Sequence, residues 1–160
     1  MIAGMRLALV VFVAGCAYKA GSYAYMSNGF PGQRTTLGCL DLAVSRLADS
    51  YDGAVLQFQF GNRCDHEAVV SLPKTAQGRL SDGGEKMLSV YDPDAEVAPK
   101  KLDGRSFGAE TLEYRAETGD RIAEICIDAG TIAGVDGAHV LCFGGSPGEA
   151  TPSQQPPAAR

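Results

Sequence analysis

The stretch Leu56-Gln57-Phe58-Gln59-Phe60 alternates strictly between an apolar and a polar side chain. Successive side chains of a β-strand point to opposite faces of a sheet, so this period of two predicts a strand with one buried face. Residues 40–45 show the same alternation, and residues 50–53 between the two stretches read Ser-Tyr-Asp-Gly, which is a turn composition. Together they predict an antiparallel hairpin.

Further strand-like bursts follow along the chain, separated by turns rich in Asp and Gly. They lie at residues 68–72, 87–91, 111–115, 121–128 and 138–143. No helical stripe of comparable strength appears. About seven short strands without alternating helices predict an all-β domain over residues 37–143, an antiparallel β-sandwich of the immunoglobulin-like kind. A small β-barrel is the alternative.

The beginning of the chain has the composition of a secretory leader. Arg6 precedes an uninterrupted apolar run over residues 7–13, and two small residues, Ala14 and Gly15, follow that run. A short apolar run between a positive charge and small residues predicts a signal peptide, here residues 1–15. The run is far below the ~20 residues that a membrane-spanning helix needs.

The motif Val13-Ala14-Gly15-Cys16 resembles the lipobox of bacterial lipoproteins, which is an aliphatic residue, two small residues and an obligatory Cys. The resemblance covers residues 1–16 only. It implies that Cys16 becomes the first mature residue and is fatty-acylated, so that the lipid bilayer is a partner of the chain. Ala17, in place of the Asp that retains many lipoproteins in the inner membrane, implies the outer membrane of a Gram-negative bacterium. The periplasmic and surface faces stay open, and an ordinary signal peptide with a chance Cys is the alternative.

Two segments outside the strand pattern have linker-like composition. Residues 16–36 hold several Gly, Ser and Thr residues without a regular period, which predicts a lipidated N-terminus and a tether. Some of its aromatic residues are unusual for a spacer and indicate that part of it docks as an extra edge strand: Tyr18, Tyr23, Tyr25 and Phe30. Residues 144–160 are rich in Pro, Gly and Gln and are predicted to be a disordered tail.

Four cysteines remain after Cys16: Cys39, Cys64, Cys126 and Cys142. An even set in an oxidising compartment predicts two disulfides. We favour Cys39 with Cys64 and Cys126 with Cys142, because each pair brackets two strand-like runs. The apolar register of the first hairpin leaves its two cysteines on opposite faces, so we expect a bulge at Gly61 to restore the match. Four free thiols or metal ligands are the alternative.

Potential sites for chemistry are few. The densest run of metal-ligating residue types is Cys64-Asp65-His66-Glu67, but neighbouring residues of an extended chain point to opposite sides. Residues 144–148 match the G-x-S-x-G hydrolase pattern, yet Pro147 lacks the N–H that an oxyanion hole needs. The acidic residues 92–96 lack the Gly and Glu positions of a calcium loop. We therefore expect no catalytic residue, no metal and no cofactor.

The charge balance excludes one class of partner. The chain has 14 Lys and Arg against 19 Asp and Glu, a net charge of −5, which argues against nucleic-acid binding. The leading hypothesis is a non-enzymatic lipoprotein of the cell envelope that binds or scaffolds an unknown envelope protein or glycan. A carrier of a small ligand or metal in the periplasm is the alternative. An enzyme with scattered acids, such as Asp41 with Glu124 or Glu110 with Glu113, is a third hypothesis.

The interior of the domain separates the first two hypotheses. A solid core favours the scaffold, and a hollow lined by the same faces favours the carrier. The residues expected on these faces are Leu42, Phe58, Phe60, Ile125 and Ile127.

Overall fold

The computed structural model describes residues 21–26, 30–47, 53–91 and 97–145. They form ten strands and one short helix: β1 (Gln33–Leu37), β2 (Leu40–Arg46), β3 (Gly53–Asn62), β4 (Ala68–Val70), β5 (Thr75–Leu80), β6 (Glu85–Val90), β7 (Lys100–Leu102), β8 (Phe107–Arg115), β9 (Ile122–Asp128), α1 (Ala129–Ala133) and β10 (Val140–Gly144). The predicted leader with Cys16, the acidic residues 92–96 and the tail from residue 146 lie outside the described residues. So do residues 50–52 of the predicted turn.

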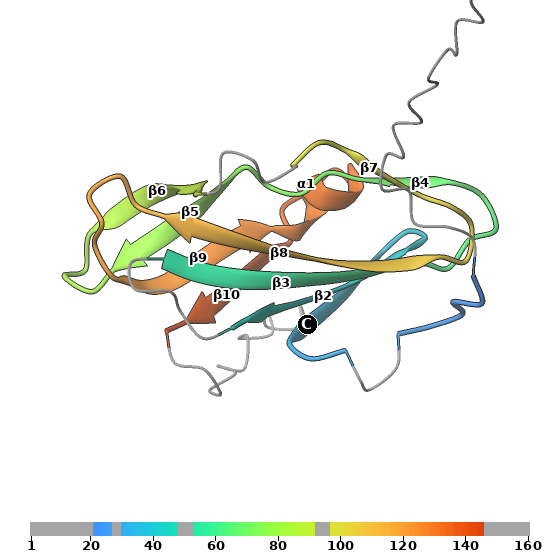
Figure 1. The fold of residues 1–160 in the computed structure, drawn as a ribbon, viewed down its shortest axis with the longest axis horizontal. Helices are drawn as coiled ribbons and strands as arrows, with labels where there is room; N and C mark the ends of the chain where they lie inside the picture. The colour runs from blue at the N-terminus through green and yellow to red at the C-terminus, as the bar shows by residue number, and fades with distance from the viewer. Residues whose placement is uncertain (1–20, 27–29, 48–52, 92–96, 146–160) are drawn as a thin grey trace, which may run out of the picture.

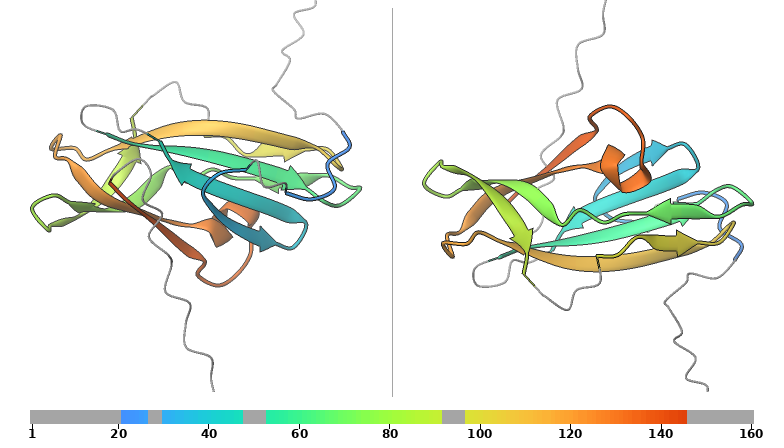
Figure 2. Two further views of the ribbon diagram at one scale, coloured as in Figure 1. Left: turned by 90° about the horizontal axis from the view of Figure 1, so that it is seen from below. Right: turned by 90° about the horizontal axis from the view of Figure 1, so that it is seen from above.

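Eight strands form one sheet in the order β1-β2-β3-β8-β6-β5-β9-β10, and β4 pairs separately with β7 (Figure 1). The pairs in both sheets are antiparallel. The prediction of an all-β, antiparallel fold is therefore confirmed. The large sheet curls so far that its two ends approach each other, and it is nearly closed as a barrel (Figure 2).

Side chains bridge the two ends of this sheet. The Gln33 side-chain amide on β1 donates a hydrogen bond to the main-chain oxygen of Cys142 on β10 at 2.6 Å. The Arg46 guanidinium, at the end of β2, donates to the main-chain oxygens of Ile122 at 2.7 Å and Phe143 at 3.1 Å. Arg46 thus satisfies acceptors on β9 and β10 together, which the planar guanidinium is well suited to do.

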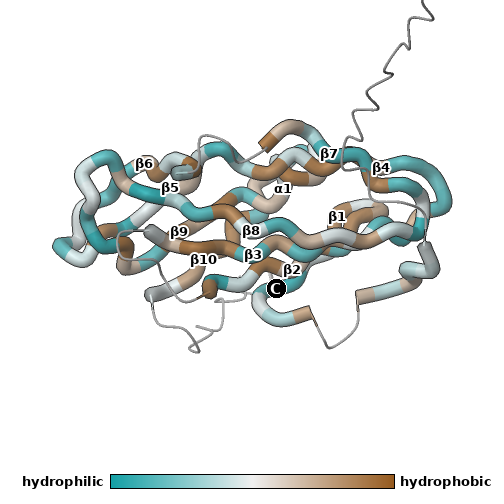
Figure 3. Tube along the Cα trace, in the orientation of Figure 1, coloured by the Kyte–Doolittle hydropathy of each residue, from teal (hydrophilic) through white to brown (hydrophobic). Residues whose placement is uncertain are grey.

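The inner faces of the strands are packed against each other. The hairpin register pairs Leu42 with Phe60 and Val44 with Phe58, as the alternation predicts. All four of these side chains are fully buried, and so is that of Ile125. Brown and teal segments alternate along the strands in Figure 3, as the alternation of apolar and polar residues predicts. The faces that would line a carrier cavity are therefore packed with side chains.

Several elements differ from the sequence prediction. Strands β1, β5 and β7 and helix α1 lie outside the predicted strands. The inward positions of β5 include Ala76 and Gly78, which carry little apolar signal. A Cβ atom on Gly78 would lie 2.7 Å from the Leu88 side chain, so close packing requires a glycine there.

The folded body also begins earlier than residue 37. Strand β1 starts at Gln33, inside the predicted tether, and Tyr23 is buried with 8% of its surface exposed. The predicted docking of part of this segment is confirmed by β1, which is an edge strand of the large sheet.

The predicted bulge at Gly61 is wrong. The register runs without a break from Leu40 opposite Asn62 to Arg46 opposite Leu56. Cys39 and Cys64 lie just beyond the paired residues, where the chain is no longer bound to the alternation of a strand. The irregularity that the structure does contain lies between Arg79 and Leu80, where β5 meets β9.

Candidate functional site

The structure joins Cys39 to Cys64 and Cys126 to Cys142, which are the two pairs that the sequence favours. Cys126 and Cys142 face each other directly in the β9–β10 ladder. The other disulfide ties the β1–β2 turn to the segment after β3, across a sequence separation of 25 residues. Each disulfide therefore fastens one end of the curled sheet.

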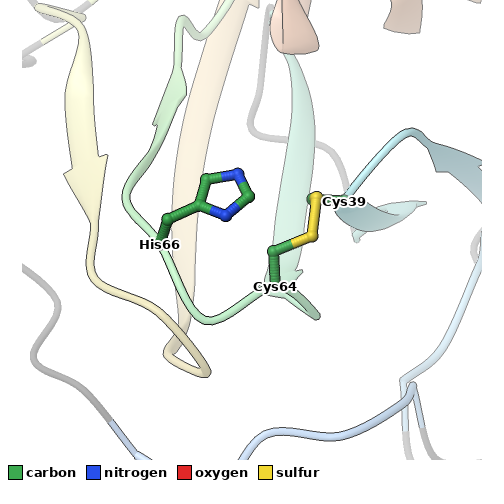
Figure 4. Close-up of side chains that lie close together, drawn as sticks. All are labelled: Cys39, Cys64 and His66. Atoms are coloured by element: carbon green, nitrogen blue, oxygen red, sulfur yellow. A yellow bond between two sulfur atoms is a disulfide. The ribbon is translucent and has the colours of Figure 1, made fainter.

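His66 lies beside the Cys39–Cys64 disulfide (Figure 4). Ligand atoms of these three residues lie within 4.8 Å of one another. Zinc and copper bind cysteine as the thiolate, and here both sulfurs are used in the disulfide. Metal binding and the disulfide therefore exclude each other at this position.

The two acids of the predicted ligand run, Asp65 and Glu67, are not part of this cluster of three residues. The carboxylate of Asp65 lies 3.4 Å from His66 Nδ1, but the Asp65 side chain is 92% exposed. Glu67 forms an ion pair with Lys101 at 3.0 Å. The run Cys64-Asp65-His66-Glu67 thus faces several directions, as expected for adjacent residues.

A buried amide organises the loops around this disulfide. The Asn62 side chain is fully buried, and its nitrogen donates to the main-chain oxygens of His66 at 2.7 Å and Asp103 at 3.2 Å. Its oxygen accepts a hydrogen bond from the Cys64 main-chain N–H at 3.0 Å. Asn62 therefore holds the β3–β4 and β7–β8 connections together at one end of the molecule.

The segment 21–26 packs against this end. The Tyr23 main-chain N–H donates to the oxygen of Arg105 at 2.9 Å. The Tyr23 ring lies over Gly61 on the outer face of β3, where a Cβ atom would come within 2.1 Å of a ring carbon. Gly61 therefore makes room for the ring, and this explains the glycine near the end of β3.

Asp41 holds the other end of the Tyr23 side chain. The Tyr23 hydroxyl donates to Asp41 Oδ2 at 2.9 Å, and the Thr36 hydroxyl donates to Asp41 Oδ1 at 2.8 Å. Arg63 Nε lies 3.2 Å from the same Oδ1 as an ion pair, although out of line for a hydrogen bond. Only 5% of the Asp41 side chain is exposed, so burial removes most of the water around the carboxylate. The hydrogen bonds and the ion pair with these partners take the place of that water.

The pKa of Tyr23 is raised above the ordinary tyrosine value, first because the phenol is removed from water and second because it donates to Asp41. The phenol therefore stays protonated, and remains a donor, to a higher pH than an ordinary tyrosine does.

Next to this contact lies an aromatic hollow of about 340 Å³. It is lined by Ser22, Tyr23, Ala24, Tyr25, Phe30 and Phe107. Phe107 is opposite Gly61 in the β3–β8 register, and the Phe30 ring meets the Tyr23 ring edge-on with centroids 6.4 Å apart. Tyr25 is 74% exposed and Phe107 is 63% exposed. Exposed aromatic rings gathered at one place indicate an interaction surface.

No family model, curated protein or solved structure matches this chain. Assignment of function therefore depends on the geometry and the sequence motifs of this chain alone. In the part of the chain that the structure describes, no helix is both long and apolar enough to cross a bilayer.

Each acid of the pairs considered as catalytic groups forms an ion pair with a different cation. Asp41 forms an ion pair with Arg63 at 3.2 Å, whereas Glu124 forms one with Arg79 at 3.3 Å. The other pair lies on β8. Its two members face different cations: Glu110 with Lys100 at 2.5 Å, and Glu113 with Arg115 at 2.5 Å.

The aromatic hollow is the feature that the sequence shows least clearly. Tyr23, Tyr25 and Phe30 stand out as aromatic residues in a segment with linker composition. Phe107 gives no such signal, because an aromatic residue at the start of a strand is ordinary. Only the register that places Phe107 opposite Gly61 brings it beside Tyr23.

Proposed function

We propose that the chain is a lipid-anchored cell-envelope lipoprotein that acts as a non-enzymatic binding or scaffolding module. The observation that carries the proposal is the lipobox-like motif ending at Cys16, directly after a short apolar run. Acylation places two or three chains on this residue. Each buried methylene contributes ~0.8 kcal/mol, so more than one chain gives lasting attachment. We place the protein in the outer membrane of a Gram-negative bacterium, on the basis of Ala17.

The cysteine pairing supports a location outside the cytosol. Both pairs among the four remaining cysteines are oxidised in the structure, and disulfides persist in oxidising compartments. The packed core supports a scaffold or a surface binder in place of a carrier that encloses its ligand.

We further propose that the domain functions as an immunoglobulin-like sandwich of two half-sheets. Only Ser89 and Val90 of β6 pair with β8, whereas β3 pairs with β8 over nine positions. This short ladder divides the eight strands into β1-β2-β3-β8 and β6-β5-β9-β10. Such a scaffold presents its outer faces and end loops to a partner, an envelope protein or a glycan.

The decisive experiment is the mass and fractionation of the native protein. We expect a mature chain that begins at Cys16 and carries acyl groups, and a Cys16→Ser variant that leaves the membrane fraction. A bare cysteine with the leader still attached, or unchanged membrane association of the variant, would refute the proposal.

One observation favours a second candidate function, that of a metal carrier. A dithiol reductant would convert the Cys39–Cys64 disulfide into two thiols beside the His66 imidazole, which is a ligand set suited to zinc or copper. The structure holds the oxidised form, so this candidate applies only after reduction.

A further inference from the structure

We propose that the aromatic hollow rests on the lipid–water interface of the membrane that holds the acylated Cys16. The hollow comprises Tyr23, Tyr25, Phe30 and Phe107 with Ser22 and Ala24. This inference rests on the proposed lipoprotein anchor and adds an orientation: the end of the sheet that bears the hollow faces the bilayer, and the opposite end faces away.

The first argument is the reach of the chain. Gly21 follows Cys16 by five positions. A fully extended chain covers at most ~3.6 Å per residue, so Gly21 lies within about 18 Å of the anchored residue. A Cβ atom on Gly21 would lie 3.2 Å from the oxygen of Arg105, and Phe107 is two residues further along the chain. The hollow is therefore held close to the bilayer by covalent geometry.

The second argument is that the segment bearing the hollow is fastened to the sheet. The Tyr23 hydroxyl is bound to the buried carboxylate of Asp41, and its main-chain N–H is bound to Arg105. The predicted tether is therefore not free along its whole length. Because the docked segment is fastened to the sheet, the position of the lipid anchor restricts how the sheet is oriented relative to the membrane.

The third argument is the chemistry of the exposed rings. Tyr25 and Phe107 expose most of their surface although they are large and apolar. Tyrosine and other amphipathic aromatic side chains are favoured at the level of the lipid headgroups, where the ring leaves water and the hydroxyl stays hydrated. The two exposed rings have the arrangement that a shallow interfacial contact requires.

The lining also argues against a glycan as the occupant. Pockets for polar ligands such as sugars place several polar groups around the ligand, among them amide and charged side chains. Among the described residues, the lining contains no amide and no charged side chain. The Tyr23 hydroxyl is already committed to Asp41. A lipid interface needs no such groups and therefore fits the hollow better.

The test uses single tryptophans in the full acylated protein purified from membranes. The chain contains no Trp, so Phe107→Trp introduces one reporter in the hollow. Met87→Trp is a matched control, because Met87 is 60% exposed and Phe107 is 63% exposed. Met87 lies on β6, which pairs with β8 at Arg115. Arg115 and Phe107 are the two ends of β8, about 26 Å apart at ~3.3 Å per residue. Tyr25→Trp is a second reporter in case one substitution disturbs folding.

The proteins are reconstituted into vesicles of phosphatidylethanolamine and phosphatidylglycerol that contain a lipid brominated near its headgroup. We expect the Phe107→Trp and Tyr25→Trp indoles to lose emission and shift to shorter wavelength, while the Met87→Trp indole is unchanged. Equal quenching at both ends, or no quenching of the hollow reporters in protein that co-sediments with the vesicles, would overturn the orientation and leave the anchor intact.

Two further measurements separate failure of the anchor from failure of the lipid contact. A mass spectrum without acyl groups on Cys16 would refute the proposed function, and the inference would fall with it before any fluorescence is recorded. Soluble muropeptides that change the Phe107→Trp emission without vesicles would assign the hollow to a glycan and overturn the lipid contact.

Discussion

The Tyr23 hydroxyl lies 2.9 Å from the Asp41 carboxylate, and this hydrogen bond joins the segment nearest the proposed anchor to the outer face of β2. Gly61 lies opposite Asp41 in the ladder and leaves space for the ring. The Tyr23 ring packs over Gly61, and the Tyr23 hydroxyl donates a hydrogen bond to the buried Asp41 carboxylate. Docking of the N-terminal segment therefore depends on these three residues.

Removal of the Tyr23 hydroxyl tests this contact. Tyr23→Phe deprives the buried Asp41 of a donor, and we expect the free energy of unfolding to fall by about 1–3 kcal/mol. Urea unfolding of the two proteins measures the change. Tyr25→Phe removes a hydroxyl from a side chain that is 74% exposed and should leave the stability unchanged. Equal effects of the two substitutions would contradict the role of Asp41.

Two buried tyrosines predict a loss of stability in alkali. The pKa values of Tyr23 and Tyr114 are both raised above the ordinary value of 10.0, with burial as the largest cause in each. Above pH 10 the unfolded chain loses phenol protons that the folded chain keeps. The free energy of unfolding should therefore be level below this pH and fall above it, by up to about 1.4 kcal/mol per pH unit for each tyrosine.

Unfolding measured between pH 8 and pH 11.5 checks this dependence. The Tyr114 hydroxyl donates to the main-chain oxygen of Pro73 at 2.7 Å. Tyr114→Phe should flatten part of the alkaline slope, and Tyr23→Phe should flatten another part. An unchanged slope in both variants would show that other groups cause the alkaline loss.

Each disulfide should contribute to stability. The chain closed by Cys39 and Cys64 has a sequence separation of 25, and that closed by Cys126 and Cys142 has one of 16. Replacement of either pair by serines should lower the free energy of unfolding by roughly 2–4 kcal/mol, because the unfolded chain gains freedom. Thiol titration of the denatured, unreduced protein checks that these four cysteines are oxidised, and four reactive thiols would contradict the disulfides.

The closure of the sheet predicts a strong effect at Arg46. Arg46→Lys replaces the planar guanidinium with a single ammonium that cannot reach both Ile122 and Phe143 in the same way. We expect the free energy of unfolding to fall by about 1–3 kcal/mol. Arg79→Lys is the control, because its ion pair with Glu124 is largely exposed and should contribute about 0–1 kcal/mol. A similar loss in both variants would show that Arg46 has no special role at the seam.

Metal content separates the two candidate functions. Protein prepared without reductant should hold no stoichiometric zinc or copper, because the disulfide occupies both sulfurs near His66. Elemental analysis before and after treatment with dithiothreitol measures this. One equivalent of metal in the unreduced protein would contradict the expectation. Metal bound only after reduction, and lost in His66→Ala, would support the carrier.

Local patterns in the sequence are sufficient for the strands with a strong apolar alternation. The hairpin register of Leu42 with Phe60 follows from the sequence because a shift of one residue would turn every apolar side chain outward. The sequence favours the two disulfide pairs that the structure contains. Cys39 and Cys64 flank β2 and β3, whereas Cys126 and Cys142 lie within β9 and β10. Strand β5 could not be found in this way, because its inward residues Ala76 and Gly78 are small and give no apolar pattern. Their small size leaves space for the Leu88 side chain of β6.

The sequence by itself determined that the domain is all-β, because the period of two is a property of each strand taken alone. The tertiary structure alone decided that Tyr23 reaches Asp41, that Phe107 lies beside Tyr23 and that Arg46 closes the sheet. These contacts join residues distant along the chain. Their geometry depends on how far the sheet curls, and no local pattern encodes that curvature.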